Sequence, residues 1–112
     1  MRYTRVLASA AIITFAMVVA PAASAGSTPG AAKIYQAKCA SCHGADGGGK
    51  TKAGIAMKAR DLRSPAVQKQ TDVELLKIIA DGRKKMPAYK KKLSVADIKS
   101  LVACVRDLAT KK

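Results

Sequence analysis

Two cysteines and a histidine lie within five consecutive residues, Cys39-Ala40-Ser41-Cys42-His43. A Cys-x-x-Cys-His sequence is typical of a c-type haem attachment site, in which two sulfurs form thioether bonds to the porphyrin and the imidazole binds the iron. On a continuous helix, positions i, i+3 and i+4 share one face, so both sulfurs reach the porphyrin edge while the imidazole points to its centre. The five residues alone are also compatible with a redox-active or zinc-binding Cys-x-x-Cys.

An iron held by one histidine needs a second axial ligand or keeps an open position. Met86 is the leading candidate, because it lies in a segment predicted as a loop and Pro87 stiffens the backbone beside it. Met57 follows His43 so soon that little chain is left to cross a porphyrin. His43 is the sole histidine, which excludes bis-histidine ligation within one chain. We expect His43 and Met86 to bind the iron; the alternative for Met86 is a flexible residue that fills a gap in the core.

A thioether ligand is soft and favours Fe(II), so methionine ligation raises the reduction potential relative to bis-histidine ligation. With both axial positions filled by the chain, the iron would present no open site. This favours electron transfer over oxygen or peroxide chemistry.

The start of the chain predicts an export signal. Arg2 and Arg5 precede an uncharged run over residues 6–20, and Ala23-Ser24-Ala25 forms a small-residue cleavage site. The apolar run is shorter than the roughly 20 residues that span a membrane. We expect residues 1–25 to be a cleaved signal peptide and the protein to be periplasmic; an uncleaved membrane anchor is the alternative.

The remaining residues, 26–112, are enough for one domain with a modest core. Without its leader the chain keeps 19 of its 21 lysines and arginines against 7 acidic residues, a formal charge of +12. A nucleic-acid partner is disfavoured, because an exported chain with one Phe, no Trp and no nucleic-acid motif has little to recognise bases. The charge indicates a solvated basic surface, a docking surface for acidic proteins, or attraction to an anionic membrane.

The helix signals predict an all-α domain without strands. A first helix is expected over residues 31–39 with Thr28 as its cap, and a helical turn at Ser64-Pro65. Thr71-Asp72-Val73-Glu74 and Ser94-Val95-Ala96-Asp97 are capping boxes that begin two longer helices, the first of which ends at Gly82. The first of these helices has an apolar set and the second carries its apolar residues on one stripe; they are Val73, Leu75, Leu76, Ile78 and Ile79, then Ile98, Leu101, Val102, Val105 and Leu108.

A glycine-rich stretch follows the cysteine motif. Residues 44–54 hold five of the eight glycines and predict an irregular wrapping loop. Residues 44–51 also match the phosphate-binding pattern G-x4-G-K-T letter for letter. That match overlaps the cysteine motif and follows a helix rather than a strand, so its context disfavours nucleotide binding.

Residues 31–112 resemble a small soluble class I cytochrome c. The stretches that carry the resemblance are Ala31-Ala32-Lys33-Ile34-Tyr35, Cys39-Ala40-Ser41-Cys42-His43-Gly44, Lys84-Lys85-Met86-Pro87-Ala88-Tyr89, Leu93-Ser94-Val95-Ala96-Asp97-Ile98 and Leu101-Val102-Ala103-Cys104-Val105-Arg106. The resemblance implies three to five helices around one haem c, covalently bound through Cys39 and Cys42, with crossed terminal helices that bring Ala31 near Leu101. It also implies a monomeric one-electron carrier between larger redox proteins, not an enzyme.

Two positions depart from that family. Cys104 stands where the last helix usually carries an aromatic residue; we interpret it as a small apolar core residue, with an intermolecular disulfide as the alternative. Residues 54–57 replace the usual proline whose carbonyl orients the axial histidine, so the partner of His43 is left open.

Arg60 is a candidate partner for a haem propionate, with a solvated arginine as the alternative.

Six basic residues flank Met86 on both sides; they are Arg83, Lys84, Lys85, Lys90, Lys91 and Lys92. Their charge favours docking of an acidic redox partner at the haem edge, and the alternative is a non-specific basic surface.

Two other functions are left open. One is a haem protein that senses or binds a small ligand through a labile Met86. The other is a thiol–disulfide oxidoreductase that uses Cys39 and Cys42, for which the sequence lacks the usual βαβ scaffold.

Overall fold

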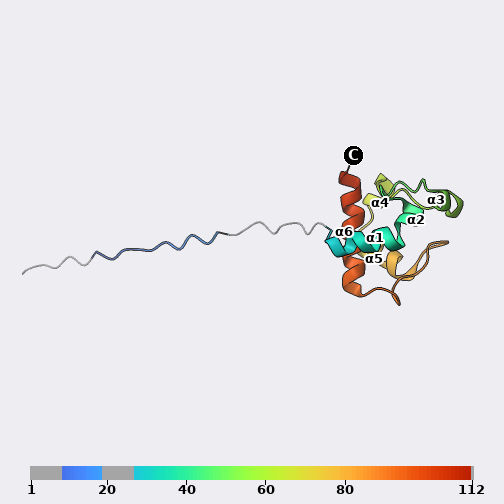
Figure 1. Ribbon diagram of the computed structural model, residues 1–112. Helices are drawn as coiled ribbons and strands as arrows, with labels where there is room; N and C mark the ends of the chain where they lie inside the picture. The colour runs from blue at the N-terminus through green and yellow to red at the C-terminus, as the bar shows by residue number, and fades with distance from the viewer. Residues whose placement is uncertain (1–8, 19–26, 112) are drawn as a thin grey trace, which may run out of the picture.

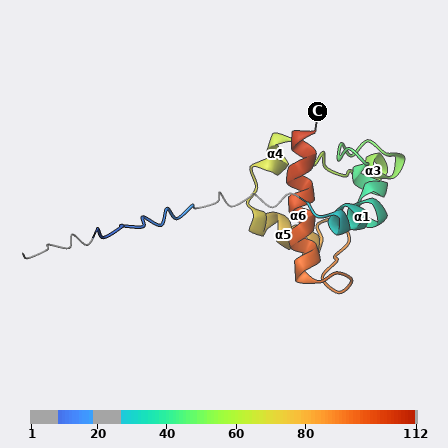
Figure 2. The same ribbon diagram turned by 60° about the vertical axis from the view of Figure 1, so that its left-hand side comes forward.

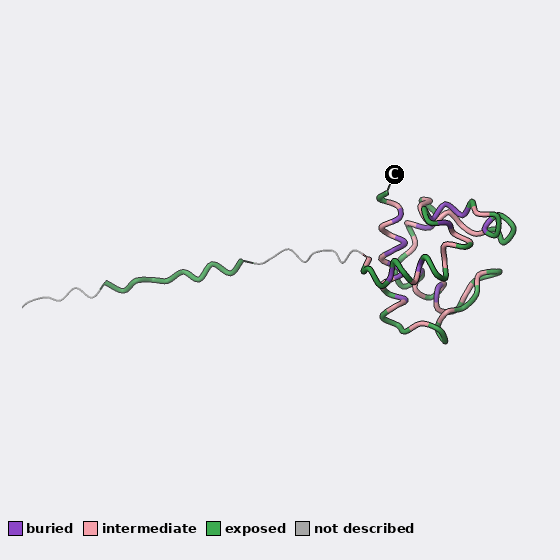
Figure 3. Tube along the Cα trace, viewed as in Figure 1, coloured by how far each residue is buried: buried purple, intermediate pink, exposed green. Residues whose placement is uncertain are grey.

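The structure is a computed structural model that describes residues 9–18 and 27–111 (Figure 1). The predicted cleavage site at residues 23–25 lies outside the described residues. Residues 9–18 form no helix and are exposed to solvent (Figure 3). In the described ranges, no helix combines the length and the apolar character needed to span a bilayer.

The chain from residue 27 to residue 111 folds into helices joined by loops, without a named strand. Six helical segments follow one another, namely α1 Pro29–Lys38, α2 Ala40–His43, α3 Lys52–Met57, α4 Pro65–Gln68, α5 Asp72–Asp81 and α6 Val95–Thr110. The predicted all-α class is confirmed. The segments outnumber the three to five expected, because the chain turns at Cys39 between α1 and α2 and because α2 and α4 are single turns.

Serine and threonine caps set the helix starts. The side-chain oxygens of Thr28, Thr51 and Ser64 accept backbone N–H groups at the starts of α1, α3 and α4. The capping boxes predicted at Thr71 and Ser94 are both formed, so the starts of α5 and α6 are confirmed. Each cap stabilises its helix by about 1 kcal/mol, since it satisfies a backbone donor that the helix leaves without a partner.

The core lies where α1 crosses α6, with α5 packed against α6 from another side (Figures 1 and 2). Ala31 on α1 and Leu101 on α6 are each 2% exposed and belong to the same apolar cluster. A methyl side chain at Ala31 lets the two helices approach closely, as predicted. Not every apolar residue of α5 is buried: Val73 is 75% exposed, because the buried stripe of α5 runs through Leu75 and Ile79.

The glycine-rich stretch is a loop only as far as Thr51. The prediction of a loop to residue 54 was wrong, because Gly54 lies inside α3. A Cβ atom at Gly54 would collide with the backbone oxygen of Cys42. Glycine therefore allows α3 to pack directly against α2.

Candidate functional site

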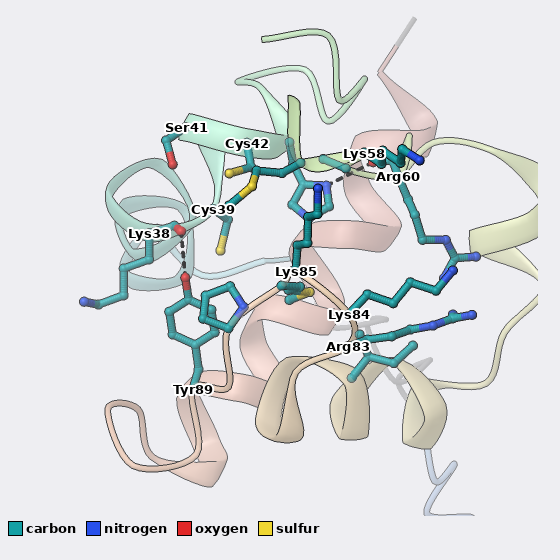
Figure 4. A pocket seen from close by; sticks show the side chains of 16 residues that line it. Lys38, Cys39, Ser41, Cys42, Lys58, Arg60, Arg83, Lys84, Lys85 and Tyr89 are labelled. Carbon is teal, nitrogen blue, oxygen red and sulfur yellow. Dashed lines mark hydrogen bonds between the residues drawn. The ribbon is translucent and has the colours of Figure 1, made fainter. Parts of the chain in front are cut away.

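A cavity of about 870 Å³ opens between two walls of the domain (Figure 4). One wall consists of the end of α1, α2 and the chain from the end of α3 to Arg60; the other consists of α5 and the loop that follows it. The four residues predicted as haem ligands, Cys39, Cys42, His43 and Met86, all line this cavity. Its size is within the range of small-molecule and cofactor sites.

The cysteine motif forms a helical turn that continues α1 after a change of direction. The carbonyl of Cys39 accepts the backbone N–H of Cys42 at 3.2 Å and that of His43 at 2.9 Å. The three side chains therefore keep the i, i+3 and i+4 relation that places them on one face. Figure 4 shows Cys39 and Cys42 on the same side of the cavity.

The imidazole of His43 is oriented by a backbone carbonyl. Its Nδ1 lies 3.0 Å from the carbonyl oxygen of Arg60. A carbonyl can only accept, so Nδ1 carries the proton, and in the neutral ring Nε2 keeps a free lone pair. This arrangement fixes the tautomer and leaves Nε2 as the atom that can bind a metal. The partner of His43 left open by the sequence is therefore the carbonyl of Arg60, several residues after the stretch 54–57.

Met86 lies on the opposite wall, at the end of a tight turn. Arg83 and Met86 exchange two backbone hydrogen bonds, at 2.9 and 3.2 Å, with Lys84 at a positive φ of 53° between them. Gly82, which ends α5, lies directly behind this turn. A Cβ atom at Gly82 would be 2.7 Å from the carbonyl oxygen of Met86. The turn is thus packed against the end of α5.

Met57 also lines the cavity, but from the wall of His43. It ends α3, which packs against α2, the helix that carries His43. Two axial ligands must approach an iron from opposite faces of a porphyrin. The placement of the two methionines therefore favours Met86.

The cavity fits a porphyrin with one histidine and one methionine ligand. Two thiols lie along one edge, an imidazole nitrogen is free on one wall, and a thioether sulfur comes from the other. Soft sulfur and imidazole are suitable donors for iron. In the described ranges, no group of three or more His, Cys, Asp or Glu residues forms an alternative metal site.

A family profile described as "Cytochrome C oxidase, cbb3-type, subunit III" matches residues 27–104. The chain belongs to the cytochrome c family. The resemblance inferred from the sequence is confirmed, and haem c is the cofactor of this family.

Curated relatives and solved structures agree with this assignment. The cytochrome is 34% identical to cytochrome c6 of Nostoc sp. over 103 residues, covering 92% of this chain and 88% of the relative. It is also 34% identical to cytochrome c6 of Leptolyngbya boryana over 79 residues, covering 70% of this chain and 89% of the relative. The solved structure of the KustC0563 c-type cytochrome superposes with a TM-score of 0.65 at 32% identity, covering 70% of this chain and 95% of that one. The cytochrome c fold is therefore confirmed together with the family.

The rim of the cavity is positively charged. Six of its lining residues are cationic and none is acidic; the cations are Lys38, Lys58, Arg60, Arg83, Lys84 and Lys85. Figure 4 shows Arg83, Lys84 and Lys85 on one side of the cavity and Lys58 and Arg60 on the other. Arg60 donates to the side-chain oxygen of Gln70 at 3.0 Å, so its guanidinium is held beside the cavity.

All seven side-chain carboxylates of the cytochrome have partners other than the six cations of the rim. Four form ion pairs, which are Asp46 and Asp61 with Arg63, Asp72 with Arg106, and Asp81 with Lys90. Glu74 and Asp97 accept N–H groups in the two capping boxes, and Asp107 accepts the backbone N–H of Ser27 at 2.8 Å. The positive charge at the rim is therefore not neutralised by neighbouring acidic side chains of the domain.

The first cysteine of the motif, Cys39, lacks the acidic thiol of a redox catalyst. Burial raises the pKa of the Cys39 thiol to about 11. Thiol–disulfide oxidoreductases need the opposite shift, to between about 3.5 and 7.5. The oxidoreductase interpretation is therefore disfavoured by the raised pKa of Cys39 as well as by the all-α fold.

Cys104 is 6% exposed within the core cluster, in agreement with its interpretation as a small apolar residue. Three features of the cavity were not predicted from the sequence, namely the carbonyl of Arg60, the side chain of Ile78 and the ring of Tyr89. Ile78, one of the apolar residues of α5, lines the cavity. No residue type signals the carbonyl of Arg60, since every residue has a carbonyl.

Proposed function

We propose that this cytochrome carries one electron at a time between larger redox proteins, with one haem c bonded to Cys39 and Cys42 and held axially by His43 and Met86. When bound, haem c supplies a reversible Fe(III)/Fe(II) couple. The observation that carries the proposal is the placement of His43 Nε2 and the Met86 sulfur on opposite walls of one cavity.

The residues of the chain suit a carrier rather than an enzyme. The carbonyl of Arg60 holds the imidazole ring in one orientation, and the turn at residues 83–86 is packed on Gly82, so both side chains would hold a haem iron from fixed positions. Two ligands from the chain leave no position for a substrate. Small rearrangement and no open site together favour rapid electron transfer.

Two methionine variants test the ligand set. Met86→Ala should keep covalent haem on a denaturing gel, lose the weak far-red band of ferric methionine–iron ligation, and bind carbon monoxide readily when reduced. Met57→Ala is the matched control, since Met57 lines the same cavity, and it should retain the band. Loss of the band in Met57→Ala but not in Met86→Ala would show that the axial ligand is misassigned.

The same experiment separates the alternative function. A wild-type protein that binds carbon monoxide as readily as Met86→Ala would be a ligand-binding or sensing haem protein with a labile methionine. A wild-type protein that stays colourless after expression with a haem-attachment system would exclude both haem functions.

We further propose that residues 1–25 are removed on export to the periplasm. The match to the family profile begins at residue 27, and α1 begins two residues later with Thr28 as its cap. The backbone N–H of Ser27 is bonded to Asp107, so the packed domain starts directly after the predicted cleavage site. Mass spectrometry of protein from the periplasmic fraction should give an N-terminus at Gly26; a mass that includes the first 25 residues would indicate an uncleaved anchor.

The partner is proposed to be a redox protein with an acidic docking surface, bound by a monomer of this cytochrome. The cationic rim surrounds the cavity where the haem edge would lie, and opposite charge raises the rate of encounter. The rate of electron transfer to such a partner should fall as ionic strength rises, because salt screens exposed charges.

A charge-reversal pair makes this test specific. Lys85→Glu on the rim should slow the bimolecular rate at low salt more than Lys99→Glu, whose side chain is exposed on α6 outside the cavity. Equal effects of the two variants would mean that only the net charge matters. Sedimentation with anionic vesicles measures the alternative partner, a membrane surface.

A further inference from the structure

The two walls of the cavity are joined by very few polar contacts. The backbone of the loop over residues 83–93 bonds to itself and to the end of α5, through Ile79 and Ala80. Among the hydrogen bonds of residues 27–111, one alone connects this loop to the wall that carries the cysteine motif. In that bond the hydroxyl of Tyr89 donates to the carbonyl oxygen of Lys38 at 3.0 Å (Figure 4).

The acceptor is at a sensitive position. Lys38 is the last residue of α1 and directly precedes Cys39. The last carbonyls of a helix have no intrahelical donor and need other partners. The hydroxyl of Tyr89 is the donor for the carbonyl of Lys38, directly before the first cysteine of the motif.

The donor is held in place from several directions. The backbone N–H of Tyr89 lies 3.1 and 3.2 Å from the carbonyls of Ile79 and Ala80, at the end of α5. The ammonium of Lys92 is 5.8 Å from the centre of the Tyr89 ring. Burial raises the pKa of the Tyr89 hydroxyl, so it remains a protonated donor at neutral pH. Tyr89 therefore connects the end of α5, through its backbone, to the end of α1, through its hydroxyl.

We propose that the Tyr89 hydroxyl is a latch that keeps the Met86 loop closed against the Cys39 wall, and so sets how often Met86 leaves the iron. Tyr89 is a positioning residue: it contacts the cavity, but it acts through Met86. The proposal rests on the proposed ligation by His43 and Met86. It adds a hydrogen bond that controls the opening of the loop.

The test uses Tyr89→Phe, which removes the hydroxyl and keeps the ring. A net hydrogen bond of ordinary strength corresponds to a two- to tenfold change in an equilibrium constant, in round figures. Imidazole binds ferric iron only when Met86 has left, so its apparent affinity is proportional to the open fraction. We expect Tyr89→Phe to bind imidazole about two- to tenfold more tightly than the wild type. Amide hydrogen exchange over residues 83–93, a readout independent of the iron, should accelerate by a similar factor.

Tyr35→Phe is the matched control. The hydroxyl of Tyr35 donates to the carbonyl of Gly44 at 2.7 Å, but both residues belong to the same wall and Tyr35 does not line the cavity. This variant should lower the overall stability and leave the imidazole affinity within about twofold of the wild type.

Each outcome decides between the proposals. Wild-type imidazole affinity in Tyr89→Phe, with the far-red band present in both proteins, overturns the latch and leaves the ligand set intact. An equal increase in Tyr35→Phe also overturns the latch, because loosening of the whole domain would then explain the effect. A wild type without the methionine–iron band overturns the ligand set and the latch together.

Discussion

Gly82→Ala should separate the position of Met86 from the rest of the fold. Gly82 has a φ of 76° and a ψ of 170°, a backbone conformation that is essentially restricted to glycine and costs other residues about 1–3 kcal/mol. An added Cβ would also lie 2.7 Å from the carbonyl oxygen of Met86 and 3.0 Å from the backbone nitrogen of Ala88. These are backbone atoms of the ligand loop, so the loop itself must move, at a cost of about 1–3 kcal/mol for overpacking.

The two costs together predict a loss of about 2–6 kcal/mol in the free energy of unfolding. Equilibrium denaturation in guanidinium chloride, followed by haem absorbance and by circular dichroism, measures this loss. Because the loop is displaced first, the methionine–iron band should weaken in Gly82→Ala even without denaturant. Covalent haem should remain.

Gly30→Ala is the control, and it should change the free energy of unfolding in the opposite direction. Gly30 lies in the first turn of α1, and its added Cβ would meet only the Thr28 hydroxyl oxygen, at 3.9 Å. Alanine is the better helix former, so this variant should be stabilised by about 0.5–1 kcal/mol. Gly82→Ala with wild-type stability and an intact band would refute the close packing of the Met86 loop on the end of α5.

Three further predictions follow from contacts of α6. Arg106→Leu should destabilise the domain by about 2 kcal/mol in chemical denaturation, because the guanidinium donates to Asp72 and to the backbone carbonyls of Gln68 and Gln70. The N–H of Ser27 holds the pKa of Asp107 in the folded protein below its usual value. The hydrogen bond from Ser27 to the Asp107 carboxylate therefore stabilises the fold above about pH 4, and this stabilisation is lost as the pH falls through the pKa of Asp107 in the folded protein. The stability difference between wild type and Asp107→Asn should therefore shrink on acidification; a constant difference would contradict the assignment. Burial and the raised pKa of Cys104 predict that a thiol reagent modifies it in the holoprotein only after unfolding; rapid reaction in the folded protein would show an accessible thiol.

The parts of this domain that are encoded locally were predictable. The capping boxes at Thr71 and Ser94 gave the starts of α5 and α6, because a cap and its reciprocal partner lie three residues apart. The cysteine motif is also encoded locally, because its three side chains share a face within a single helical turn. Its ligation, like that of Met86, remains a prediction, although the structure brings all four residues to one cavity.

The parts that depend on tertiary contact were not predictable. Gly54 was placed in a loop because glycine disfavours helices, but here its missing side chain is what allows α3 to pack on α2. The acceptor for His43 is a main-chain oxygen, which no residue type reveals. Val73 belongs to the apolar set of α5, and only the packing of α5 against α6 shows that it is exposed to solvent.

The turn at Cys39 has a consequence for biogenesis. Both cysteines that would form the covalent linkage lie within one short stretch whose shape depends on hydrogen bonds between near neighbours. The opposing sulfur is brought in only after α3, α4 and α5 have been added to the chain. The geometry that covalent attachment would need is therefore available in one local turn, before the tertiary fold brings Met86 to the opposite wall of the cavity.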